Sequence, residues 1–213
     1  MLENLKNALK KNYKFIILLM CLIVVLAIVE DVFDKETIEL DLLIYKLVVQ
    51  NMRNNILTNI FKFVTNLGGA YFLIAISILS LIFVKNKKIS FAICINLVLV
   101  TILNLLLKNI VERPRPIGYR LIDETGYSFP SGHSMISCAF YGLIIYFIWK
   151  NIKNNKVRNA SCVLLGILIL LIGISRIYLG VHYATDVLGG FLISVSYLII
   201  FTSTYKVIFN NDN

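Results

Sequence analysis

The chain has 213 residues, of which 58% are apolar and only 15% charged, and its mean hydropathy is +0.80. Soluble domains contain about 45–50% apolar and about 25% charged residues, so these values exclude an ordinary water-soluble protein and indicate a single domain, residues 1–213, in a lipid bilayer. The net charge of +9 does not indicate nucleic-acid binding, because the basic residues lie in short clusters between apolar runs.

The first apolar run, residues 15–29, follows a basic stretch, as the core of a signal peptide does. It ends in the acidic sequence 30–34 and has no small-residue cleavage site. We therefore interpret it as a retained first membrane span.

The next segment, residues 37–50, has apolar residues at the helical spacing i, i+3, i+4, i+7 and i+8. These residues are Leu40, Leu43, Ile44, Leu47 and Val48. The spacing favours an amphipathic helix along the outer membrane interface. A partly buried connecting helix without a lipid role has the same pattern, and the two interpretations stay open.

Five further apolar runs follow, at residues 67–84, 89–107, 134–149, 160–174 and 183–205. Several are shorter than the ~20 residues that a spanning helix needs, but flanking residues such as Trp149 and Lys150 can supply the missing turn. No run alternates with a period of two, so helices are the expected spanning element. The sequence predicts an all-α integral membrane bundle of six transmembrane helices with an interfacial helix after the first span.

The Lys and Arg residues of the connections predict the orientation. Twelve lie in segments 1–14, 85–88, 150–159 and at Lys206, and nine lie in the connections on the other side, together with ten of the twelve acidic residues. We expect a multi-pass plasma-membrane protein with both termini in the cytoplasm. The basic excess on the outer side then needs another explanation.

Three polar clusters lie in connections on this outer side. The first is Lys108-Asn-Ile-Val-Glu-Arg-Pro-Arg-Pro116. Its prolines disfavour helix at the preceding arginines, so the third span is expected to end near Glu112, with Lys108 in its last turn and Arg115 beside it. A basic helix end that pairs Lys108 with Glu112 is the alternative.

The second cluster is Pro130-Ser131-Gly132-His133, directly before an apolar run. A Pro, a Ser that can cap and a Gly predict a helix start, and the free N–H groups of a helix start bind anions. His133 is then expected in the first turn, facing the anion, although a lone histidine is more often structural.

The third cluster runs from Ser175-Arg176 to His182 and Asp186 and joins the last two spans. His182 and Asp186 are four residues apart, which places them on one face if the segment is helical. An Asp beside a His commonly determines which ring nitrogen carries the proton, and ionisable residues at membrane depth are usually functional. A purely structural pair is the alternative.

Together, Lys-x6-Arg-Pro (108–116), Pro-Ser-Gly-His (130–133) and Ser-Arg-x5-His-x3-Asp (175–186) resemble the three-part signature of the type-2 phosphatidic acid phosphatase superfamily. The motifs occur in order without a departure at a signature position, and the resemblance covers about residues 60–205. The layout of six spans is similar to that of the bacterial lipid phosphatases of this family. The soluble haloperoxidases that share the signature lack the six spans.

The resemblance implies a metal-independent lipid phosphatase, and the orientation expected from the Lys and Arg residues places its active site at the outer face. His182 is expected to attack phosphorus and form a phosphohistidine, Asp186 to hold its other ring nitrogen, and His133 to serve as acid and then base. The phosphate-binding residues implied are Lys108, Arg115, Ser131, Gly132 and Arg176. These cations would also explain the basic excess outside. The roles of Arg113 and Arg120 stay open.

We expect no cofactor and no metal site, because the four cysteines lie singly in apolar runs and form no ligand cluster. The expected partners are a membrane lipid phosphate and the bilayer, without nucleic acid or an obligate protein partner. Undecaprenyl diphosphate is the first choice of substrate, and phosphatidylglycerol phosphate or phosphatidic acid the second. A lipid phosphotransferase that uses the same phosphohistidine, and a transporter of phosphate lipids, are the alternative functions.

Overall fold

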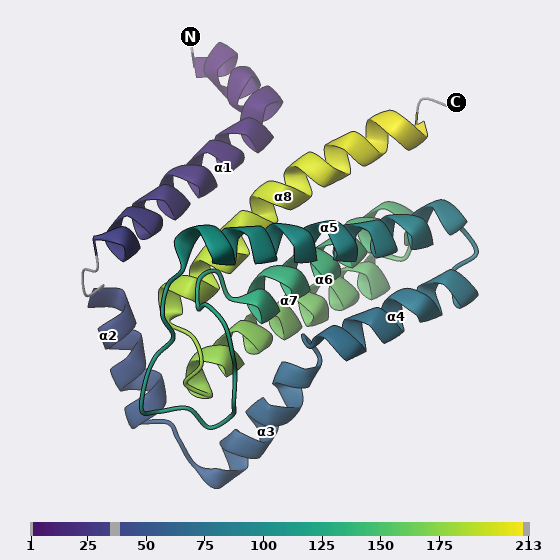
Figure 1. Cartoon of the computed structure of the whole chain (residues 1–213). Helices are drawn as coiled ribbons and strands as arrows, with labels where there is room; N and C mark the ends of the chain where they lie inside the picture. The colour runs from purple at the N-terminus through teal and green to yellow at the C-terminus, as the bar shows by residue number, and fades with distance from the viewer. Residues whose placement is uncertain (1, 35–38, 211–213) are drawn as a thin grey trace.

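The computed structural model describes residues 2–34 and 39–210, and over these residues the chain forms helices and no strand. In chain order the helices are α1 (Leu2–Phe33), α2 (Glu39–Tyr45), the π-helix η1 (Lys46–Gln50), α3 (Asn55–Asn66), α4 (Ala70–Phe83), α5 (Lys87–Val111), α6 (Gly132–Asn151), α7 (Asn155–Tyr178) and α8 (Ala184–Asn210) (Figure 1). The predicted all-α fold is confirmed.

Among the residues that the structure describes, five helices are long and apolar enough to cross a membrane: residues 12–33 of α1, then α5, α6, α7, and residues 184–209 of α8. Helices α3 and α4 meet the same criteria only as a pair, which is bent by 45° at a short break. Helix α4 alone has 14 residues and is about 21 Å long, which is less than the ~30 Å of the hydrocarbon core. The expected second span is therefore not one straight helix over residues 67–84, and six spans result only when the bent pair counts as one.

Two glycines produce this break. Leu67 ends α3, and Gly69 is extended at the start of α4. A Cβ atom on Gly68 would lie 2.6 Å from Cγ2 of Ile172 in α7 and 3.6 Å from Cδ2 of His133. Only glycine allows the backbone to approach α7 this closely, so the break packs beside one of the expected site residues.

Helix α6 lies at the centre of the bundle. Half of its apolar window is buried inside the protein, the largest share among the candidate spans. Phe140 and Leu143 are fully buried and form one cluster with Leu73 of α4 and Ile172 of α7. Helix α6 also packs against α5 and α8, while α1 packs along α8. The start of α6 is thus surrounded by the helices that carry the other polar clusters.

Large apolar side chains cover the outside of the bundle. Leu26 of α1, Leu106 of α5 and Leu164 of α7 each expose more than half of their surface. Such a continuous apolar exterior is unfavourable in water and favourable against lipid. The chain is therefore a multi-pass membrane protein, as its composition indicates.

The segment after the first span differs from the single amphipathic helix expected over residues 37–50. Residues 37 and 38 lie outside the described part of the chain, and the rest forms α2 followed by the π-helix η1. Leu42, Leu43 and Leu47 are exposed, as on an interfacial helix. Asp41 and Val49 are buried, as in a connecting helix. The segment thus has an exposed apolar face and a side that packs on the protein.

The polar clusters meet at one end of the bundle. The last turns of α5 and α7 and the first turns of α6 and α8 lie there, joined by connections 112–131 and 179–183. Figure 1 shows the first connection as a thin teal trace beside α2 and α3, on the side away from the chain's two ends. The amide of Leu121 donates to the carbonyl of Leu179 (2.9 Å), which joins the two connections. Within the first connection, the amide of Ser128 donates to the carbonyl of Arg113 (2.8 Å).

Candidate active site

A cavity of about 380 Å³ lies where the three polar clusters converge. Five of the eight expected site residues line it: Lys108, Arg115, Gly132, His133 and His182. The other three are almost completely buried. Arg176 and Asp186 contact the lining residues Glu124 and His182, and Ser131 directly precedes Gly132. The structure therefore gathers all eight residues around one site.

His182 and Asp186 form a hydrogen-bonded pair, although not on one helical face as expected. Helix α8 begins at Ala184, so His182 lies in the connection before it and Asp186 lies in the first turn. Nδ1 of His182 is 3.3 Å from Oδ2 of Asp186. The same oxygen accepts the amide of Tyr183 (2.8 Å) and the hydroxyl of Ser128. Asp186 thus accepts the amide of the residue before α8, as the third residue of a capping box does, and is also the partner of the histidine.

The other ring nitrogen of His182 faces the cavity. Because Nδ1–H donates a hydrogen bond to the Asp186 carboxylate, the lone pair of the neutral ring is on Nε2. Nε2 lies 3.0 Å from Nη1 of Arg115. Burial, together with the positive charges of Arg176 and Arg115, lowers the pKa of His182 to about 4 despite the opposing effect of Asp186. At neutral pH the imidazole is therefore uncharged. Its Nε2 lone pair accepts from Arg115 here, and it can attack a phosphorus atom once a phosphoryl oxygen takes over that donor.

Arg115 is held in place by backbone carbonyls. Its Nε donates to Gly126 (3.0 Å), Nη1 to Val181 (2.9 Å) and Nη2 to Thr125 (3.0 Å). Burial lowers the pKa of Arg115, but a guanidinium stays charged at physiological pH. Arg115 is therefore a rigid positive charge next to His182.

Arg176, at the end of α7, is 1% exposed. Its Nη1 donates to the hydroxyl of Thr65 in α3 (2.7 Å), and its Nη2 is paired with the carboxylate of Glu124. Its Nε is buried and has no hydrogen-bond partner among the residues that the structure describes. A buried donor without a partner is costly, and a phosphoryl oxygen is a suitable acceptor for it.

Lys108 lies in the last turn of α5, as expected, and Glu112 ends this helix with φ of 50°. The Nζ atom donates to the carbonyl of Tyr127 (2.5 Å) and lies 3.5 Å from that of Ser128. The pairing of Lys108 with Glu112, considered from the sequence, is not among the ion pairs of the described residues. Lys108 is directed toward the cavity.

The start of α6 forms as predicted, with one difference. Ser131 is the N-cap, and His133 lies in the first turn and lines the cavity. Ser131 is fully buried, and its Oγ accepts from the hydroxyl of Ser134 (2.9 Å) and from its amide (3.5 Å). Its oxygen thus serves the helix start itself, whereas Gly132 faces the cavity. A Cβ on Gly132 would lie 3.1 Å from Oδ1 of Asn104, which shows how closely α5 packs here.

Several site residues were not identified from the sequence. Ser128 and Glu124 come from the connection 112–131, whose sequence carries no motif for them. Asp41 was expected only as part of an amphipathic segment, yet it bonds with Arg113 and Thr185 beside Asp186. The available signal for Asp41 was an acidic residue at a position of the apolar helical stripe, three residues before Ile44 and seven before Val48.

A second, larger cavity of about 830 Å³ also reaches His182. Its lining is mostly apolar and comes from the end of α1, from α2 and η1, and from the start of the connection 112–131. Examples are Phe33, Leu42, Val49 and Ile117. His182 thus lies between a polar cavity and an apolar one. Among the described residues, no group of three or more His, Cys, Asp or Glu side chains is arranged to hold a metal ion.

The family model of the PAP2 superfamily matches residues 88–209. Phosphatidylglycerophosphatase B of Bacillus subtilis strain 168 is 46% identical over 91 residues, which are 42% of this chain and 45% of that protein. The aligned region thus spans less than half the length of that relative. An undecaprenyl-diphosphatase of Sulfolobus acidocaldarius is 28% identical over 196 residues, 87% of each chain.

Two crystal structures are similar to the whole bundle. The first transmembrane PAP2-type phosphatidylglycerolphosphate phosphatase from Bacillus subtilis has a TM-score of 0.79 and 30% sequence identity, covering 92% of this chain and 98% of the other. Aquifex aeolicus LpxE has a TM-score of 0.64 and 28% identity, covering 76% of this chain and 94% of the other.

Proposed function

The chain belongs to the PAP2 superfamily, and from this premise we propose that it is a membrane lipid phosphatase that works through a phosphohistidine on His182. The observation that carries the proposal is the position of His182: Nδ1 faces the Asp186 carboxylate at 3.3 Å, and Nε2 faces the cationic cavity next to Arg115 at 3.0 Å. An uncharged imidazole oriented in this way is suited to attack a phosphorus atom.

Lys108, Arg115 and Arg176 bind the phosphoryl oxygens. Phosphoryl transfer needs positioning and charge stabilisation more than covalent chemistry, and positive groups held in advance provide both. Arg115 and Arg176 are immobilised by their carbonyl and hydroxyl partners. The backbone N–H groups at the start of α6, at Gly132, add an anion site of the kind that helix N-termini form.

The reaction has two steps. In the first, the Nε2 lone pair of His182 forms a bond to phosphorus while the bond to the lipid oxygen breaks, and protonated His133 gives its proton to that oxygen. In the second, neutral His133 takes a proton from water as the water oxygen bonds to phosphorus and the P–N bond breaks. Phosphate is released, and both histidines return to their starting protonation states.

The lipid part of the substrate lies in the apolar cavity. This cavity reaches His182 from the side of α1 and α2, and burial of hydrocarbon there contributes roughly 0.8 kcal/mol per CH₂. Undecaprenyl diphosphate is our first choice of substrate, and phosphatidylglycerol phosphate or phosphatidic acid the second.

We also propose that the site lies at the outer face of the plasma membrane with both termini in the cytoplasm, within a single domain. The basic connections 85–88 and 150–159 are at the end of the bundle opposite to the site. The Lys and Arg bias of these connections supports their cytoplasmic location.

Phosphate release by the purified protein tests this function. We expect turnover of lipid phosphates or diphosphates that persists in chelator and is lost in His182→Asn. Arg158→Met is the matched control, because Arg158 stacks on Trp149 (4.5 Å) at the start of α7, far from the site. Turnover by His182→Asn, or silencing by chelator with recovery in magnesium, would contradict the proposal.

A further inference from the structure

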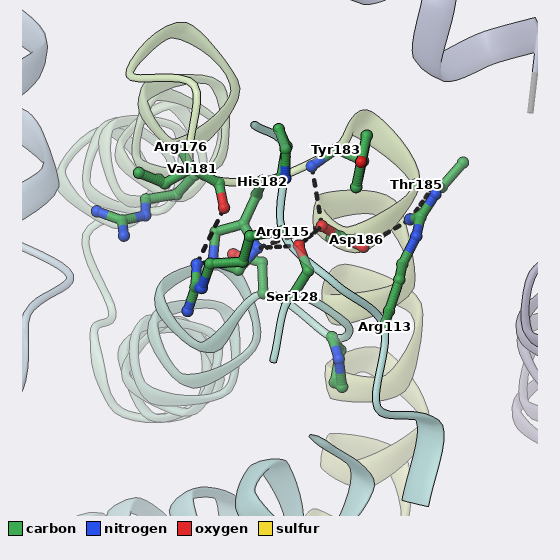
Figure 2. A network of polar contacts seen from close by, with 12 residues as sticks. Arg113, Arg115, Ser128, Arg176, Val181, His182, Tyr183, Thr185 and Asp186 are labelled. Atoms are coloured by element: carbon green, nitrogen blue, oxygen red, sulfur yellow. Dashed lines mark hydrogen bonds and ion pairs between the residues drawn. The ribbon is translucent and has the colours of Figure 1, made fainter. Parts of the chain in front are cut away.

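Arg113 is the centre of a buried ionic network next to the histidine pair. Its Nη1 donates to Oδ1 of Asp186 (2.6 Å) and to the hydroxyl of Thr185 (2.8 Å), and its Nη2 donates to Oδ2 of Asp41 (2.7 Å). Asp41 also accepts the amide and the hydroxyl of Thr185, both at 2.8 Å. Figure 2 shows Asp186 between His182 on one side and Arg113 on the other.

The network is buried and its charges are compensated. Arg113, Asp41 and Asp186 are 9%, 7% and 0% exposed. Burial acts to lower the pKa of Arg113, but the Asp186 and Asp41 carboxylates outweigh it and raise the pKa above its ordinary value. The guanidinium also stacks on the ring of Tyr183 at 4.1 Å. Arg113 therefore has one defined position.

Arg113 is not a fourth phosphate ligand. It does not line the cationic cavity but lines the apolar one, together with Asp41. Both of its terminal nitrogens are already bonded to carboxylates. Its interaction with the reaction is therefore indirect, through Asp186.

The two oxygens of Asp186 have separate partners. Oδ2 accepts from Tyr183 and Ser128 and faces Nδ1 of His182, whereas Oδ1 accepts from Arg113. A rotation of the carboxylate would exchange these partners, and the charge-assisted bond to Arg113 opposes it. Because the contact with His182 is long at 3.3 Å, its geometry depends on this orientation.

We propose that Arg113 is a positioning residue for the Asp186–His182 pair and that Asp41, on α2, holds Arg113 in place. This assignment rests on the proposed function. It links α2, outside the three sequence motifs, to the nucleophile through Asp41, Arg113, Asp186 and His182. Replacing outer-shell residues that orient metal-binding histidines commonly costs about 10- to 100-fold in activity, and we expect an effect of similar size at this metal-free pair.

Three variants test the assignment in the full-length protein. Arg113→Met is expected to slow phosphoenzyme formation by about 10²-fold and leave KM near the wild-type value, because the phosphate-binding residues are unchanged. In Arg113→Lys, the lysine can contact only one carboxylate at a time, so the rate of phosphoenzyme formation is expected to fall about tenfold. Asp41→Asn keeps the size of the side chain but removes its charge and weakens the hold on Arg113, so a smaller decrease in the rate of phosphoenzyme formation is expected. Arg158→Met serves as the control.

Guanidinium rescue separates positioning from mere structural support. The apolar cavity of about 830 Å³, which Arg113 and Asp41 line, gives a small cation access to the gap left in Arg113→Ala. Guanidinium at a non-denaturing concentration should restore the burst rate of Arg113→Ala and leave Arg158→Met unchanged. A folded Arg113→Ala without rescue, or Arg113→Lys with a wild-type burst, would overturn the assignment. Variants that raise KM without slowing phosphoenzyme formation would also overturn it.

The protonation of His182 gives a readout that needs no activity. The chain has two histidines, so ¹⁵N-histidine NMR gives two ring spectra, and His133→Asn assigns them. We expect His182 to carry its proton on Nδ1 in the wild type and to become a mixture of tautomers in Arg113→Met and Asp41→Asn. An unchanged tautomer in both variants would overturn the inference. If the wild type forms no phosphoenzyme, the proposed function fails, and the tautomer still decides the role of Arg113.

Discussion

The carboxylate of Glu124 is paired with the guanidinium of Arg176 inside the site that is proposed to bind phosphate. A second Glu124 oxygen lies 3.9 Å from Nη2 of Arg115, so the chain supplies its own anion to two of the three cations. A phosphate group that binds there competes with Glu124 for the same donors. The charge of Glu124 is therefore expected to weaken binding of a doubly charged substrate.

Glu124→Gln tests this competition. The amide keeps the shape of the side chain but removes its charge, so KM for a lipid phosphate and the inhibition constant of inorganic phosphate should both fall. A decrease of about tenfold corresponds to roughly 1.4 kcal/mol. Initial rates at several phosphate concentrations measure it. Weaker phosphate inhibition in Glu124→Gln would instead show that Glu124 orients the arginines for the ligand.

The loss of activity at low pH depends on the protonation of His182. The lowered pKa of about 4 means that His182 loses its proton well below neutrality, so the nucleophile stays neutral and active as pH falls to about 4 and is lost below it. An unperturbed histidine would be lost near 6.5. NMR titration of the His182 ring measures this directly and avoids the ionisation of the substrate. A His182 midpoint at or above 6 would contradict this account.

The two histidines should differ in their dependence on the leaving group. His182→Asn should abolish turnover of every substrate, because no phosphoenzyme forms. His133→Asn should slow the burst phase by about 10²–10⁴-fold for a lipid alkoxide, which needs a proton to leave. The loss should be much smaller for nitrophenolate or for a lipid monophosphate expelled from a diphosphate.

The measurement for His133 must resolve the burst, because the same residue is proposed to activate water in the second step. Rapid-quench kinetics with a nitrophenyl phosphate and a lipid monoester provide the comparison. Equal burst losses on both substrates would remove His133 from the acid role.

Thiol labelling tests the sidedness. In a background without Cys21, Cys94, Cys138 and Cys162, a cysteine at Ile117 should react with an impermeant reagent from outside, and one at Lys153 should not. Ile117 is 83% exposed beside the site, and Lys153 is exposed between α6 and α7. The opposite labelling pattern would place the site in the cytoplasm.

The sequence predicts the helical fold from local patterns, and it predicts eight site residues from three motifs that resemble those of a known family. Apolar runs longer than a dozen residues determine the spans, and prolines and glycines determine where α5 ends and α6 begins. The bend between α3 and α4 could not be predicted in this way. It depends on the contact of Gly68 with Ile172, which is more than a hundred residues away in the chain.

The site likewise combines residues that local motifs identify with residues that only tertiary contacts bring in. The motifs contain Lys108, Arg115, His133 and His182, and the structure places them around one cavity. The partners that hold the site together, such as Asp41 on Arg113, come from segments without a motif. Their roles arise from tertiary packing, which spacing along the chain does not encode.

The central claim is that His182 becomes phosphorylated, and trapping the phosphoenzyme tests it most directly. The purified protein is mixed with ³²P-labelled lipid phosphate and quenched within the burst, and the labelled residue is identified by peptide mapping. The account predicts a label on His182 that is stable in alkali and labile in acid, absent in His182→Asn and longer-lived in His133→Asn. Turnover by the wild type without any label on His182, or a label on another residue, would contradict it.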